Sequence, residues 1–170
     1  MQDINVTPEE YREFIRGLTL RDIRLSEGHV HSHRADIDTS SHSLRIHEDA
    51  QFTSTSSGFE VRHRYKLELE EEDTEKPCCG HIEAVFVLRF NSEVPISEDI
   101  FYIFHRMNLN MNTWPYWREY AQSSAARLGW PTITLPLVKD LRQGAEKPSK
   151  KQSAQSEQKP AKPRKKAVKK

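Results

Sequence analysis

The sequence predicts an α+β fold, with a four-stranded antiparallel sheet, a short N-terminal helix before it and two C-terminal helices after it. Three observations support this prediction: a helix-capping pattern at residues 7–17, period-two alternation of apolar residues between 18 and 90, and helical periodicity from 97 to 129. Strands grouped together and followed by helices are typical of the α+β class. At 170 residues the chain has room for one domain and a remainder.

The N-terminal helix is predicted by a capping box. Thr7 and Glu10 can satisfy each other's free backbone donors, and Pro8 occupies the first helical position. Gly17 ends the segment, whose apolar residues recur at spacings of three and four: Tyr11, Phe14 and Ile15.

Four strands are predicted next. In residues 18–33 the apolar phase changes near Arg21 and Asp22, which indicates a bulge. A weaker strand carries Leu44 and Ile46, and residues 59–70 alternate strictly between apolar and charged side chains, so one face is buried and the other faces water. In residues 82–90 one face is apolar and the other is partly apolar, which indicates a cover on that second face.

After Pro95 the period becomes helical. Ser97 is the expected N-cap of the first C-terminal helix. The second is expected to open near residues 112–113, with Pro115 in its first turn, and to stop at Gly129 before an extended apolar segment.

Charge divides the chain into two parts. Residues 144–170 contain nine Lys and one Arg against two Glu, a net of +8, which leaves −7 for residues 1–143 of a chain whose total is +1. The tail has no aromatic, Ile or Leu residue, so we expect a folded domain at 1–143 and a disordered Lys-rich tail at 144–170. No run approaches the roughly 20 apolar residues of a membrane span, and we expect a cytoplasmic protein without membrane insertion.

Candidate metal and catalytic residues are few. His29, His31 and His33 alternate along one strand and could share a metal, but a solvated strand end is the favoured interpretation. The adjacent Cys78 and Cys79, near His81, lack a second cysteine pair and are interpreted as loop residues in a reducing compartment. No nucleophile elbow, Gly-rich phosphate loop or H-E-x-x-H motif is present, so we predict no enzymatic activity, no catalytic residues, no metal and no cofactor.

Aromatic residues concentrate between Phe101 and Trp130, where eight of the fifteen in the chain lie, including every Trp. Helices packed on a sheet account for many of them. The surplus, together with Met107 and Met111, indicates an oligomer interface or a surface that adapts to apolar segments.

The motif WPYWREY at 114–120, followed by RLGWPTITLP at 127–136, resembles the closing segment of the SecB family of export chaperones. LRDIRL at 20–25 resembles the family's first strand, and the order of elements agrees over roughly residues 8–138. Among its members, the sequence is most similar to actinobacterial SecB-like chaperones, some of which accompany toxin–antitoxin systems.

The resemblance implies an ATP-independent holdase that binds unfolded or aggregation-prone client proteins in apolar grooves and assembles as a dimer of dimers. The implied client-binding residues are Ile37, Leu44, Ile46, Phe86, Trp117, Ile133 and Leu135, each of which is equally compatible with the core. The implied oligomer interface contains Ile100, Ile103, Phe104 and Met107.

Two questions about partners stay open at this point. Export chaperones of this family transfer clients to SecA through acidic residues, which 77–81 do not show clearly, so SecA and an unstable antitoxin are alternative partners. From a different class, the Lys-rich tail could bind nucleic acid through phosphate contacts, although without interleaved aromatics it would lack base stacking. A tail that only aids solubility is the favoured alternative.

Overall fold

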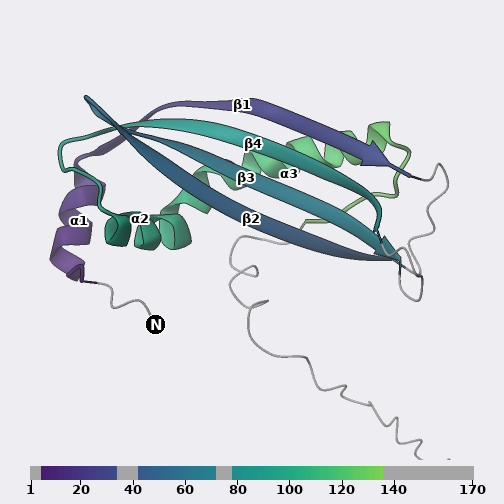
Figure 1. The fold of residues 1–170 in the computed structure, drawn as a ribbon, viewed down its shortest axis with the longest axis horizontal. Coiled ribbons are helices and arrows are strands. Elements are labelled where there is room, and N and C mark those ends of the chain that lie inside the picture. Colours follow the sequence, from purple (N-terminus) through teal and green to yellow (C-terminus); the bar gives the residue numbers. More distant parts are fainter. Residues whose placement is uncertain (1–4, 34–41, 72–77, 136–170) are drawn as a thin grey trace, which may run out of the picture.

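The fold is seen in a computed structural model, which describes residues 5–33, 42–71 and 78–135 (Figure 1). Its elements follow one another as α1 (Pro8–Arg16), β1 (Leu18–Ser32), β2 (His42–Thr55), β3 (Gly58–Glu71), β4 (Cys78–Ser92), α2 (Glu98–Phe104), the π-helical turn η2 (His105–Leu109) and α3 (Asn110–Arg127). The four long strands form one antiparallel sheet in the order β1-β4-β3-β2. The helices lie along one face of this sheet, which we call the inner face (Figure 1). The predicted tail at 144–170 and Ile37 lie outside the described residues.

The predicted fold class is confirmed. The Thr7–Glu10 capping box is formed, with Glu10 N–H donating to Thr7 Oγ1 at 3.2 Å and Thr7 N–H donating to the Glu10 carboxylate at 2.7 Å. The register of β1 shifts between Leu20 and Asp22, at the expected bulge, and shifts again between Leu25 and Glu27.

The C-terminal helices differ from the prediction in one respect. No loop separates α2 from α3, because η2 joins them directly, and Pro115 lies inside α3 rather than in its first turn. Asn112 and Thr113, the expected helix start, instead bond back to the preceding turn: the Asn112 side chain donates to Asn108 O at 3.0 Å, and the Thr113 hydroxyl to Leu109 O at 3.2 Å. These side chains satisfy carbonyls at the η2–α3 junction, where backbone pairing changes period.

The core lies between the inner face of the sheet and the helices. Tyr65 of β3 stacks on Trp117 of α3, with ring centroids 5.3 Å apart, and Phe104 packs edge-on against Phe90 at 5.4 Å. Among the aromatic residues of 101–130, five are buried (Phe101, Phe104, Trp114, Trp117 and Trp130), whereas Tyr102 and Tyr116 are exposed.

The outer face of β4 has the cover that its apolar pattern indicates. Val85 and Val87 are only 2% exposed although they face away from the helices. Arg62 of β3 donates to Glu27 of β1 at 2.5 Å, and this ion pair spans β4 between them. Because the register places Glu27 beside Val85 and Arg62 beside Val87, the two long side chains lie next to the valines and exclude water from them.

Within the described part of the chain, no helix is long and apolar enough to cross a bilayer.

Candidate functional site

A row of uncovered apolar side chains runs along the inner face of β1. Leu20, Leu25 and Val30 are 39%, 46% and 46% exposed. Their partners in β4 are Phe90, Phe86 and Ile82, which are at most 4% exposed. Directly opposed residues of an antiparallel pair share a face. The row therefore belongs to the core side of the sheet, but the helices leave it open.

Helix α3 borders this row. A Cβ added to Gly28 of β1 would collide with the Tyr120 hydroxyl, so the Tyr120 side chain of α3 reaches the backbone of the strand at this point. One turn earlier in α3, Tyr116 is 49% exposed and its ring centroid lies 6.4 Å from that of Phe86. We call Leu20, Leu25, Val30 and Tyr116 the β1–α3 strip. It combines an aliphatic edge strand with an aromatic helix border, which suits an extended apolar segment.

The residues implied as client-binding occupy two environments. Leu44, 42% exposed, and the half-buried Ile46 lie on the inner face of β2, opposite Leu69 and Leu67. The other four described ones are buried, at 6% exposure or less: Phe86, Trp117, Ile133 and Leu135. Of these, only Phe86 is in ring contact with a member of the strip. Their role in client binding stays a prediction.

Leu20, Leu25, Val30 and Tyr116 are not among the client-binding residues that the sequence predicts. Period-two patterning places Leu20 and Leu25 on a buried face, and it cannot show that β1 is the edge strand which the helices leave uncovered.

The residues of the implied oligomer interface also differ in how exposed they are. Phe104 is 1% exposed and packs against Phe14, Phe59 and Phe90, so it serves the core of the single chain. Ile100 and Ile103 are half-buried. Met107 is 50% exposed, and the neighbouring Met111 and Tyr102 are 63% and 38% exposed, so this side of the helices presents apolar surface. An assembly through it stays a prediction.

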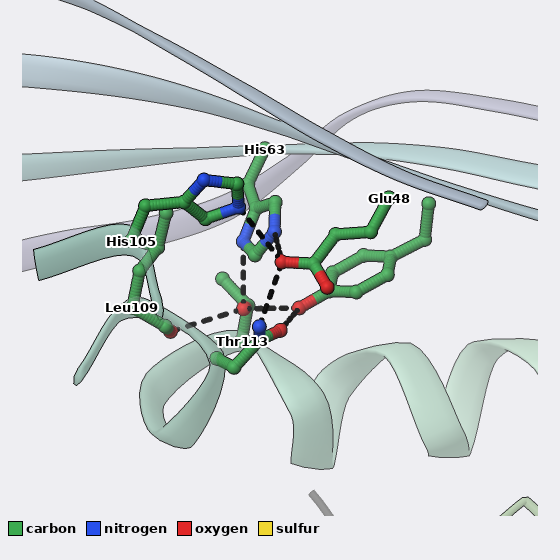
Figure 2. A network of polar contacts seen from close by, with 7 residues as sticks. Glu48, His63, His105, Leu109 and Thr113 are labelled. Carbon is green, nitrogen blue, oxygen red and sulfur yellow. Dashed lines mark hydrogen bonds and ion pairs between the residues drawn. The ribbon is translucent and has the colours of Figure 1, made fainter. Parts of the chain in front are cut away.

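A polar network lies beneath the sheet, where β2 and β3 face η2 and α3 (Figure 2). One oxygen of Glu48, Oε1, accepts three hydrogen bonds: from His63 Nε2 at 2.9 Å, from His105 Nε2 at 2.9 Å and from Asn110 Nδ2 at 2.7 Å. Three separate segments of the chain thus converge on one carboxylate.

Behind these residues a second layer completes the network. Thr113 Oγ1 lies 2.9 Å from His63 Nδ1 and 2.8 Å from the Tyr65 hydroxyl, which in turn donates to Asn110 Oδ1 at 2.5 Å. His63, Tyr65 and Thr113 are fully buried, so these contacts give them polar partners in place of water.

The network shifts the ionisation of its members. Desolvation alone would raise the pKa of Glu48, but hydrogen bonds from His105 and His63 outweigh it and lower that pKa to about 2. Burial lowers the pKa of His63 despite the opposing influence of Glu48. Burial also raises the pKa of Tyr65. Near neutral pH, Glu48 is therefore an anion and Tyr65 is neutral.

Glu48, His63 and His105 form the group whose ligand atoms all lie within 4.8 Å of one another, among the residues that the structure describes. The sequence does not predict this group, because its members are far apart in the chain and none belongs to a spaced metal motif. The one sequence feature that indicates the group is that Glu48 and His63 occupy inward positions of strands whose other inward residues are mostly apolar.

The alternating histidines at 29, 31 and 33 lie elsewhere. His29 and His31 pair with Glu83 and His81 on the outer face, and His31 contacts His33 with ring centroids 4.3 Å apart. All three are exposed, as expected for a solvated strand end. Cys79, interpreted from the sequence as a loop residue, lies in β4 and is buried.

Comparison with known proteins identifies the fold. No protein-family model and no curated protein matches the chain. Among solved structures, the chain is similar to the Mycobacterium tuberculosis SecB-like chaperone Rv1957 in complex with a ChAD peptide from the antitoxin Rv1956 HigA1. The TM-score is 0.63 with 20% sequence identity, and the match covers 72% of this chain and 91% of that chain. The chain therefore has a SecB-like fold.

Proposed function

We propose that this protein is an ATP-independent holdase chaperone that binds unfolded or aggregation-prone proteins through apolar surface and performs no catalysis. The observation that carries the proposal is the β1–α3 strip, in which Leu25 and Val30 are each 46% exposed on the core side of the sheet. Burying apolar surface stabilises a complex by about 25 cal/mol per Å² and demands little of the client's sequence. The SecB-like fold, shared with a chaperone solved with a bound peptide, supports the same function.

The test is suppression of aggregation. A chemically unfolded model client is diluted into buffer with a stoichiometric amount of the full chain, and light scattering is followed. We expect the wild-type chain to suppress scattering without nucleotide, and the double variant Leu25→Glu/Val30→Glu to lose most of this activity, because carboxylates in the strip oppose apolar contacts. Both positions are half-exposed, so the variant should fold, and a thermal unfolding curve checks this.

The matched control lies on the opposite face of the same strand. Arg24 and His29 are exposed on the outer face, beside Val87 and Glu83, so Arg24→Glu/His29→Glu introduces the same residues away from the strip. This control should retain suppression. Equal suppression by all three proteins would exclude the strip as the binding surface, and failure of the wild-type chain would overturn the holdase proposal.

Protein export and antitoxin protection are the two cellular roles that fit this activity. The first requires binding to SecA, and the second requires binding to an apolar extension of an antitoxin. The peptide in the complex of Rv1957 comes from an antitoxin, which favours the second role. Calorimetric titration of the full chain with purified SecA and, separately, with a candidate antitoxin extension distinguishes them.

A further inference from the structure

We propose that Glu48, His63 and His105 bind one divalent transition-metal ion of the zinc class, which would link β2 and β3 to η2. The side chains come from three elements, and the Nε2 atoms of both histidines point at Glu48 Oε1 (Figure 2). Two imidazole nitrogens and one carboxylate oxygen are a ligand set that zinc accepts in proteins.

The spacing of the ligand atoms fits such an ion after small side-chain movements. In a tetrahedral zinc site with bonds of about 2.0–2.1 Å, neighbouring ligand atoms lie about 3.3–3.4 Å apart. Here both His63 Nε2 and His105 Nε2 lie 2.9 Å from Glu48 Oε1, so these two separations would open by a few tenths of an ångström, and all three ligand atoms lie within 4.8 Å of one another.

The site is reachable from solvent on one side. The His63 side chain is fully buried, whereas those of Glu48 and His105 are 23% and 26% exposed. An ion can therefore enter past these two side chains, and water can occupy its fourth position. His63 provides a fixed ligand on the central strand β3.

The surrounding residues can orient the ligands. When Nε2 of a neutral histidine coordinates a metal, its proton resides on Nδ1 and needs an acceptor. Thr113 Oγ1 lies 2.9 Å from His63 Nδ1 and can accept this proton while its own hydroxyl donates to Leu109 O at 3.2 Å. Asn110 Nδ2 donates to Glu48 at 2.7 Å and orients the carboxylate. Such outer hydrogen bonds accompany most histidine metal sites.

His105 is supplied by a π-helical turn. It is the first residue of η2, which interrupts the helical segment between α2 and α3. Such turns are rare and occur frequently at functional sites. The π-helical turn therefore begins at the residue that would provide one of the three metal ligands.

The experiment is titration of the full chain, stripped of metal by chelation and dialysis, with Zn²⁺ by calorimetry and with Co²⁺ by visible absorption. The variants are His105→Asn and Glu48→Gln, each of which removes one ligand. The control is His31→Asn/His81→Asn, because the exposed His31 and the half-buried His81 lie together on the other face with ring centroids 5.8 Å apart and could bind metal weakly. Thermal unfolding with and without Zn²⁺ is measured for every protein.

The expected result is one ion per chain, a d–d absorption band typical of tetrahedral Co²⁺, and a melting temperature that rises with Zn²⁺. Affinity should fall at least tenfold in both ligand variants and stay unchanged in the His31/His81 control. Three outcomes would overturn the proposal: no saturable binding to the wild-type chain, unchanged binding to His105→Asn and Glu48→Gln, or loss of binding only in the control. None of these outcomes bears on the holdase activity, which is measured separately.

Discussion

Glu48 shows how one residue on an edge strand determines the polarity of the core next to it. The register places Glu48 opposite Tyr65, at an inward position of β2 between Ile46 and Ala50. A carboxylate there is stable because three donors converge on its Oε1. In exchange, it supplies the acceptor that the buried His63 requires.

The first prediction concerns this carboxylate. In the presence of a chelator, Glu48→Gln should lower the free energy of unfolding by about 1–3 kcal/mol, because it removes charge from hydrogen bonds that involve buried groups. Glu68→Gln is the matched control: Glu68 pairs with His47 at 3.0 Å, but the His47 side chain is 53% exposed, so the loss should be about 0–1 kcal/mol. Urea denaturation measures both. Equal losses would contradict the distinction between the two pairs.

A second prediction at the residue scale concerns alkaline pH. Desolvation raises the pKa of Tyr11 to about 12, and its hydroxyl donates to Asn108 Oδ1 at 2.6 Å. In the unfolded chain the same phenol ionises near pH 10. Its contribution to stability is therefore complete below about pH 10 and is lost as the pH rises towards 12.

The measurement is the free energy of unfolding at several pH values between 9 and 12. We expect a decline over this window in the wild-type chain and a shallower decline in Tyr11→Phe, which has no phenol at this position. The decline should not vanish in the variant, because burial also raises the pKa of Tyr65. Identical slopes for both proteins would show that Tyr11 does not titrate differently on folding.

At the scale of elements, the residues that end a helix or interrupt a strand were easier to predict from the sequence than the way in which two helices are joined. The Thr7 capping box, the β1 bulge and the stop at Gly129 each depend on a few neighbouring residues, and the sequence predicted all three. The direct connection of α2 to α3 was not predicted, because a proline normally indicates the first turn of a helix. The side chains of Asn112 and Thr113 bond to carbonyls at this junction, and periodicity does not show such bonds.

The third prediction concerns the end of α3. Gly129 has φ +71°, and the Trp130 N–H bonds to Ala125 O at 2.9 Å while the Gly129 N–H bonds to Ala126 O at 3.2 Å, which together form a Schellman motif. A Cβ at Gly129 meets no atom within 4 Å, so Gly129→Ala should be destabilising through its backbone conformation alone, by about 1 kcal/mol. Gly129→Asn should cost less, because Asn tolerates this conformation. If urea denaturation gave Gly129→Asn a lower free energy of unfolding than Gly129→Ala, this result would contradict the cap assignment.

At the scale of the whole molecule, the exposed large apolar side chains of the described residues, apart from Leu44 of β2, fall into two groups. One is the β1–α3 strip, and the other includes Tyr102, Met107 and Met111 on the helices. A surface that binds clients and a surface that binds other copies of the chain can coexist only if they are distinct. The half-buried Ile103 next to Met107 makes the second surface the better candidate for assembly.

The fourth prediction concerns assembly. Multi-angle light scattering should give the mass of a tetramer for the full chain and a smaller mass for Met107→Glu/Ile103→Glu, because charge at an apolar interface opposes association. The strip variant Leu25→Glu/Val30→Glu should keep the wild-type mass. A monomeric wild-type chain would contradict the implied dimer of dimers.

The sequence by itself determined the fold class, the alternation that buries the inner face of β3 and β4, and the helix ends at Thr7 and Gly129, because these follow from local periodicity and from capping residues. Only the tertiary structure decided that β1 is an edge strand with an uncovered apolar row, since patterning does not specify which strands the helices cover. Only the tertiary structure joined Glu48, His63 and His105, since their proximity depends on the β2–β3 register and on the π-helical turn that follows α2. The SecB-like fold could be anticipated from short motifs, whereas both proposed sites depend on long-range packing.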